Sequence, residues 1–112
     1  MTTQIIGTKK SSDYRRCIRF CRERQISFQE RDHREKPLSP TELEKVARDC
    51  GGYAALIDEE SAVYRKRGLA WMEYDPREEL LEDPTLLRVP IVRSDRGAAV
   101  VPDETMLREL LL

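Results

Sequence analysis

The sequence predicts an α/β domain whose elements follow the order strand, helix, strand, helical insert, strand, strand, helix. Short apolar runs that end at glycine or turn residues indicate buried strands. Apolar residues at three- and four-residue spacing give three other segments one buried helical face each. The 112 residues suit one domain, so we expect a single domain over residues 1–112 with the insert at about 39–88.

The first three elements are expected in residues 3–32. Thr3–Gly7 is a short apolar run closed by glycine, which is typical of a strand. A helix should follow, with Ser11 or Ser12 as its N-cap. Its apolar face comprises Tyr14, Cys17, Ile18 and Cys21. The run from Arg15 to Arg24 is interpreted as its solvated face, with an anion- or nucleic-acid-binding face as the alternative. Residues 26–32 predict the second strand.

The insert begins with a strong helix signal. Ser39 is placed as N-cap, Pro40 at the first helical position and Glu42 where it closes a capping box. The apolar face of this helix comprises Leu43, Val46, Ala47 and Cys50, and the pair Gly51–Gly52 should end it. Shorter helical pieces are expected at residues 53–57, 62–67 and 76–81.

The last part of the chain predicts a hairpin and a helix. A strand at Val89–Val92 should turn at Asp95–Gly97 into a returning strand at Ala98–Val101. Asp103 is then expected to cap the final helix. That helix should bury Met106, Leu107, Leu110 and Leu111.

Composition excludes several classes of protein. Twenty basic and twenty-one acidic residues give a net charge of −1, which argues against direct nucleic-acid binding by bulk charge. No apolar run approaches the roughly 18 residues that cross a bilayer, and no secretory signal is visible at the N-terminus. Three cysteines, an odd number, do not make a disulfide framework, so we expect a cytoplasmic protein.

Several short strings, in their order and spacing, resemble the ArsC/Spx family of thioredoxin-fold proteins. They are Gly7–Lys9, Arg34–Ser39, Ser61 with Tyr64–Arg65 and Gly68–Leu69, and Asp83–Arg88 running into Pro90–Val92. The resemblance implies a four-stranded mixed sheet with a helical insert after the second strand. It also implies a cis peptide bond between Val89 and Pro90.

The resemblance places Ser11 at the position of the family's nucleophilic cysteine and Tyr14 at that of the second cysteine. A thiolate there would be stabilised by the start of the helix, whereas a serine hydroxyl cannot cycle through a disulfide. The family's arginine after the second cysteine position is matched by Arg15. Its two oxyanion-holding arginines are not matched. Val89 precedes the proline, and carboxylates stand in the insert at Asp58, Glu59 and Glu60.

Two functions from different classes follow. The first is a non-catalytic protein-binding or regulatory module without cofactor or metal. Gly52 corresponds to a glycine through which the Spx branch contacts RNA polymerase, although it is equally explained as a helix cap. The alternative is a thiol-dependent oxidoreductase of arsenate reductase or glutaredoxin type, with Cys17 as a non-standard nucleophile and glutathione or glutaredoxin as its partner. A third reading is anion binding by Ser11, Ser12 and Arg15 beside Val89 and Pro90.

The remaining residues have simpler interpretations. Cys17, Cys21 and Cys50 lie on apolar faces and are expected to be structural, and no Cys-x-x-Cys pair suggests a metal site. His33 is surrounded by charged residues and is expected to be solvated. The segment Trp71–Tyr74 either packs on the sheet or forms an exposed contact patch.

Overall fold

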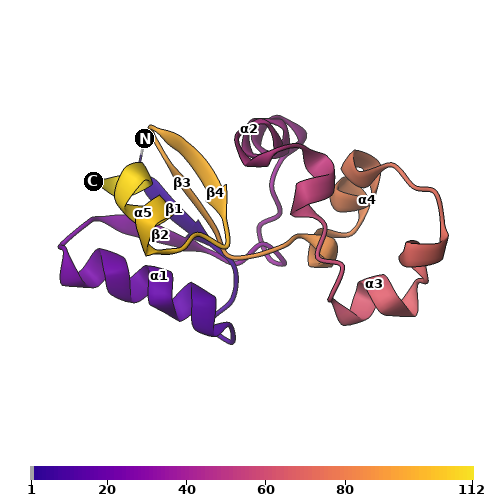
Figure 1. Cartoon of the computed structure of the whole chain (residues 1–112), viewed down its shortest axis with the longest axis horizontal. Coiled ribbons are helices and arrows are strands. Elements are labelled where there is room, and N and C mark those ends of the chain that lie inside the picture. The colour runs from indigo at the N-terminus through magenta and orange to yellow at the C-terminus, as the bar shows by residue number, and fades with distance from the viewer. Residues whose placement is uncertain (1) are drawn as a thin grey trace.

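The computed structural model describes residues 2–112 and contains a four-stranded mixed sheet with the strand order β2-β1-β3-β4 (Figure 1). The central strand β1 pairs in parallel with β2 and antiparallel with β3, and β3 pairs antiparallel with β4. The strands are β1 (Thr3–Ile6), β2 (Phe28–Arg31), β3 (Ile91–Ser94) and β4 (Gly97–Val100). The predicted element order and mixed sheet are therefore confirmed.

Two helices cover one face of the sheet. They are α1 (Ser12–Glu23), between β1 and β2, and α5 (Glu104–Leu111) at the end of the chain. Ile5 and Val92 point to this face and share a buried cluster with Cys17 of α1 and Leu107 of α5. This cluster contains Cys21 as well, so both cysteines of α1 are buried as the apolar stripe predicts.

The insert covers the opposite face. Ile6 follows Ile5 in β1, and Ile91 precedes Val92 in β3. Because successive strand residues point to opposite sides of the sheet, Ile6 and Ile91 pack against the insert. Its elements are α2 (Pro40–Cys50), η1 (Tyr53–Leu56), α3 (Ala62–Lys66), η2 (Leu69–Trp71), α4 (Pro76–Glu82) and η3 (Pro84–Leu86). Figure 1 shows α3 and α4 at the far end of the elongated molecule, which measures 44 × 26 × 25 Å.

Local side-chain signals set where the helices begin. The hydroxyl of Ser39 accepts from the backbone N–H of Glu42, whose carboxylate accepts from the N–H of Ser39, so the predicted capping box is present. Asp103 caps α5 as expected. The strand bounds differ from the prediction more than the helix starts do, since β3 begins at Ile91 rather than Val89. The bond between Val89 and Pro90, directly before this strand, is cis as the resemblance implied.

Two predictions about burial are wrong. Met106 is exposed, because α5 turns Leu107, Leu110 and Leu111 toward the sheet instead; Leu107 is buried there, and Leu110 and Leu111 are partly buried. His33 is only 5% exposed instead of solvated. It sits inside a turn that the N–H groups of Glu35 and Lys36 close by donating to the carbonyl of Asp32. Burial lowers the pKa of His33, so the ring is neutral at pH 7.

No helix within residues 2–112 combines the length and the apolar character needed to cross a membrane.

Candidate functional site

The start of α1 is the point at which the resemblance places chemistry, and Ser11 is its N-cap. The Ser11 hydroxyl accepts from the N–H of Tyr14 at 3.3 Å, while the Ser11 N–H donates to the carbonyl of Thr8 at 3.2 Å. Ser12 and Arg15 are exposed, and the Arg15 guanidinium donates to the carbonyl of Lys9 at 2.8 Å. The Ser11 hydroxyl and the Arg15 guanidinium thus already have hydrogen-bond partners within the chain. Anion binding by Ser11, Ser12 and Arg15 stays a prediction.

Tyr14 fills the space beside the cis-proline. A Cβ added to Gly7 would lie 2.9 Å from Cδ2 of Tyr14, 3.4 Å from Cβ of Val89 and 3.5 Å from Cα of Pro90. The aromatic ring and the Val89–Pro90 segment therefore meet over the glycine that ends β1, where any larger side chain would collide with the ring. Tyr14 is 2% exposed.

The Tyr14 hydroxyl is held from the neighbouring strand. It donates to a carboxylate oxygen of Glu30 in β2 at 2.8 Å. Burial, and then this hydrogen bond, raise the pKa of the Tyr14 phenol, so it remains a neutral donor. The structure thus brings together three residues named from the sequence, namely Tyr14, Val89 and Pro90. It adds Glu30, which no sequence signal marked.

The cysteines are poorly placed for thiolate chemistry. Cys17 lies more than one turn inside α1 and is fully buried, and burial raises its pKa to about 11. Burial raises the pKa of Cys21 as well. Cys50 is half-buried at the end of α2, with its Sγ 3.7 Å from the carbonyl oxygen of Ala98, and burial raises its pKa to about 11. All three are free thiols that are protonated at pH 7.

The insert presents three carboxylates at the position where the resemblance places an arginine. Asp58, Glu59 and Glu60 line a hollow of about 310 Å³ together with Arg88. The hydroxyl of Tyr64 donates to Glu59 at 3.2 Å. Gly52 lies in another part of the insert, after the left-handed C-cap Gly51 of α2, and no atom beyond its chain neighbours lies within 4 Å of where its Cβ would be. Within residues 2–112, no three or more His, Cys, Asp or Glu side chains are grouped as metal ligands.

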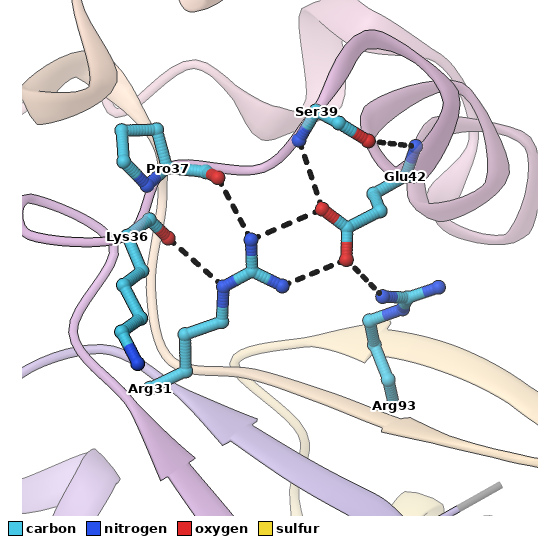
Figure 2. Close-up of polar contacts among 6 residues, drawn as sticks. All are labelled: Arg31, Lys36, Pro37, Ser39, Glu42 and Arg93. Atoms are coloured by element: carbon cyan, nitrogen blue, oxygen red, sulfur yellow. Dashed lines mark hydrogen bonds and ion pairs between the residues drawn. The ribbon is translucent and has the colours of Figure 1, made fainter.

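One polar cluster was missed by the sequence analysis. Figure 2 shows Arg31 of β2 donating two hydrogen bonds to the Glu42 carboxylate of α2. Their lengths are 2.7 and 3.0 Å. Arg31 also donates to the carbonyls of Lys36 and Pro37, and Arg93 of β3 reaches the same carboxylate at 3.3 Å. The cluster ties α2 to two strands. Within the cluster, only the Ser39–Glu42 pair had a local sequence signal, which is the capping box.

An exposed apolar patch lies at the far end of the insert. Trp71 is 92% exposed and Met72 is 56% exposed, whereas Tyr74 is partly buried and packs edge-on against Tyr64 with ring centroids 6.4 Å apart. Of the two alternatives for this segment, the structure supports the exposed patch for Trp71 and Met72. Exposed side chains of this size are typical of contact surfaces.

Comparison with known proteins identifies the fold. No protein-family model and no curated protein sequence matches the chain. Solved structures do match. An arsenate reductase from Vibrio cholerae has a TM-score of 0.82 at 22% identity, over 100% of this chain and 98% of the other. An arsenate reductase (ArsC) related protein from Brucella melitensis has a TM-score of 0.68 at 16% identity, over 97% and 93%. The ArsC-like fold that the sequence predicts is confirmed over the whole length.

Proposed function

We propose that this ArsC-like chain is a non-catalytic protein-binding or regulatory module in which Ser11 occupies the position of the family's nucleophilic cysteine. The observation that carries the proposal is the absence of a thiol at the helix start where the resemblance places the nucleophile. The hydroxyl of Ser11 caps α1 there, and the nearest cysteine, Cys17, is buried and protonated.

The surroundings of Ser11 support the same function. Tyr14 stands at the family's second cysteine position, and its ring fills the space beside Gly7 and Pro90. Where the resemblance expects anion-holding arginines, the chain has Val89 and the carboxylates of Asp58–Glu60. Carboxylates at such a position repel arsenate. The scaffold is therefore kept while the oxyanion chemistry is not.

The partner we propose is a protein. Trp71 and Met72 give the molecule an exposed apolar patch, and the balanced charge of the chain does not favour direct nucleic-acid binding. Three free thiols are compatible with a reducing cytoplasm. Glutathione or glutaredoxin enters only if the protein is instead an oxidoreductase.

The native thiols are expected to alkylate slowly at pH 7. With the pKa of Cys17 at about 11, roughly one thiol in ten thousand is ionised at that pH. The measurement is the rate of iodoacetamide labelling of each cysteine, followed by peptide mass spectrometry across a pH series. A Cys17 that reacts fast and titrates below pH 8.5 would support the oxidoreductase and reject our proposal.

Partner binding has its own test. We expect the intact protein, cross-linked in lysate of its source cells, to capture one or a few proteins reproducibly. The comparison is a W71S/M72S variant, in which both patch residues become small and polar at exposed positions. If neither protein captures anything above a bead-only background, the binding module is wrong. If both capture equally, the patch is not the surface used.

A further inference from the structure

The groove between α1 and the outer edge of β2 carries an inference about the partner. β2 is an edge strand of the sheet, and no strand of the described chain pairs with its outer side (Figure 1). A hollow of about 410 Å³ lies there, lined by α1, by Glu30 of β2 and by Lys9 of the preceding loop. We call it the α1–β2 groove.

The α1–β2 groove has an apolar floor and a basic rim. Tyr14 and Ile18, both buried, form the floor. Lys9, Arg15, Arg19 and Arg22 form the rim. A hollow of this size accommodates one or two side chains of a bound segment rather than a whole folded surface.

The arginines of α1 are used differently on its two sides. Toward α5, Arg16 donates to the carbonyl of Pro102 at 2.8 Å, and Arg24 pairs with Glu104 and stacks on the Phe20 ring. Arg22 lies on the side toward β2, and Arg19 lies between the two sides, bordering the hollows on both. The side chains of Arg19 and Arg22 make no hydrogen bond or ion pair with any residue of the described chain. Two free guanidinium groups therefore flank the apolar floor.

The acidic residues at the groove do not neutralise this rim. Glu30 accepts from the Tyr14 hydroxyl at 2.8 Å, and Glu23 is 3.8 Å from Arg24. Four cations thus face two carboxylates, which leaves a local excess of positive charge although the whole chain carries a net charge of −1. The local field favours a negatively charged ligand with an apolar portion.

We propose that the α1–β2 groove binds an acidic, extended segment of a protein partner. One apolar side chain of the segment lies over Ile18, its carboxylates contact Arg19 and Arg22, and its backbone runs along the free edge of β2. Strand addition at an open sheet edge supplies main-chain hydrogen bonds for such a segment. This inference rests on the proposed function, since it names the partner's chemistry.

The test is fluorescence anisotropy with a fluorescein-labelled peptide in which glutamates flank a central leucine. We expect saturable binding that weakens as salt is added, because the contacting charges are exposed. A peptide with glutamine in place of each glutamate should bind at least about tenfold more weakly. Equal binding of the two peptides, or no saturable binding of the acidic one, overturns the proposal.

Charge-reversal variants locate the binding. R19E/R22E should reduce affinity for the acidic peptide by about tenfold or more. R65E/K66E reverses the same number of exposed charges on α3, outside the groove, and should leave affinity within about twofold. Equal losses in both variants would overturn the proposal, as would tighter binding of a short DNA oligonucleotide than of the peptide. Circular dichroism of each variant verifies that it is folded.

The same variants separate this inference from the proposed function. If the intact protein captures a partner in lysate and R19E/R22E captures it equally well, the groove is wrong and the binding module stands. If the intact protein captures nothing, the binding module itself fails. Amide chemical shifts that the peptide moves in Phe28–Arg31 and in α1 would support the groove. Shifts moved only in the insert would reject it.

Discussion

In a Ser11→Cys variant, the new thiol is expected to alkylate about a hundredfold faster at pH 7 than Cys17. Ser11 is the N-cap of a twelve-residue helix, and its side chain already accepts the N–H of Tyr14. A thiolate there gains that hydrogen bond and the positive end of the helix, which hold thiol pKa values at about 3.5 to 7.5. The buried Cys17 has a pKa of about 11. Its greater intrinsic nucleophilicity as a thiolate offsets only part of this difference.

Ser61→Cys is the matched control. Ser61 is also an N-cap, and its hydroxyl accepts from the N–H of a tyrosine three residues on, Tyr64, at 3.2 Å. Its helix α3 has only five residues, and Asp58, Glu59 and Glu60 precede it, so neither the helix nor the local charge favours a thiolate.

The comparison uses the pH dependence of the iodoacetamide rate at each new cysteine, resolved by peptide mapping. We expect the Ser11→Cys thiol to titrate below the ordinary value of about 8.5 and the Ser61→Cys thiol at or above it. Indistinguishable titrations would mean that the start of α1 does not acidify a thiol. A serine at this position would then not explain the loss of thiol chemistry.

A Glu42→Gln variant is expected to lose about 2 kcal/mol of unfolding free energy at pH 7. Its amide keeps the size of the side chain but removes the charge that Arg31 and Arg93 share. Both guanidinium groups are largely buried, so they would be left without an anionic partner, which is costly. Glu44→Gln, on the exposed side of the same helix, should change stability by less than about 0.5 kcal/mol. Urea unfolding of both variants measures the difference.

The loss depends on pH in a defined direction. Hydrogen bonds from Arg31 are the main cause that lowers the pKa of Glu42 to about 2, against about 4.3 for an unfolded glutamate. The folded state binds this proton less readily, so the stabilisation is complete above about pH 4.5 and is lost as the pH falls toward 2. The free energy of unfolding of the wild type should fall over this pH range. That of Glu42→Gln should fall less, because the variant lacks the Glu42 carboxylate. Asp32, whose pKa is lowered by Arg34, titrates in both proteins alike.

An equal decline in wild type and Glu42→Gln would contradict the cluster in Figure 2 as a source of stability. A Glu44→Gln variant as unstable as Glu42→Gln would indicate a general effect of acidic charge on α2. Both outcomes are readable from the same unfolding curves, provided that the denaturant dependence is unchanged.

The residues that start helices could be read from the sequence because their signals are local. Ser11, Ser39 and Asp103 each accept a backbone N–H three residues ahead, so the cap and its partner lie within one turn of chain. The apolar stripe that buries Cys17 and Cys21 follows from helical periodicity alone. The mixed sheet and the cis bond before Ile91 came from resemblance, and the structure agrees with both.

By itself the sequence determined the element order, the helix caps and the absence of a thiol at the start of α1, since each depends on neighbouring residues. Tertiary structure decided the burial of His33, the outward position of Trp71 and the shared carboxylate of Glu42. It also decided that Tyr14 reaches Glu30 across the groove. The contacts of Glu42 and Tyr14 join segments far apart in the chain. Whether a side chain such as His33 or Trp71 meets water depends on how the surrounding segments pack.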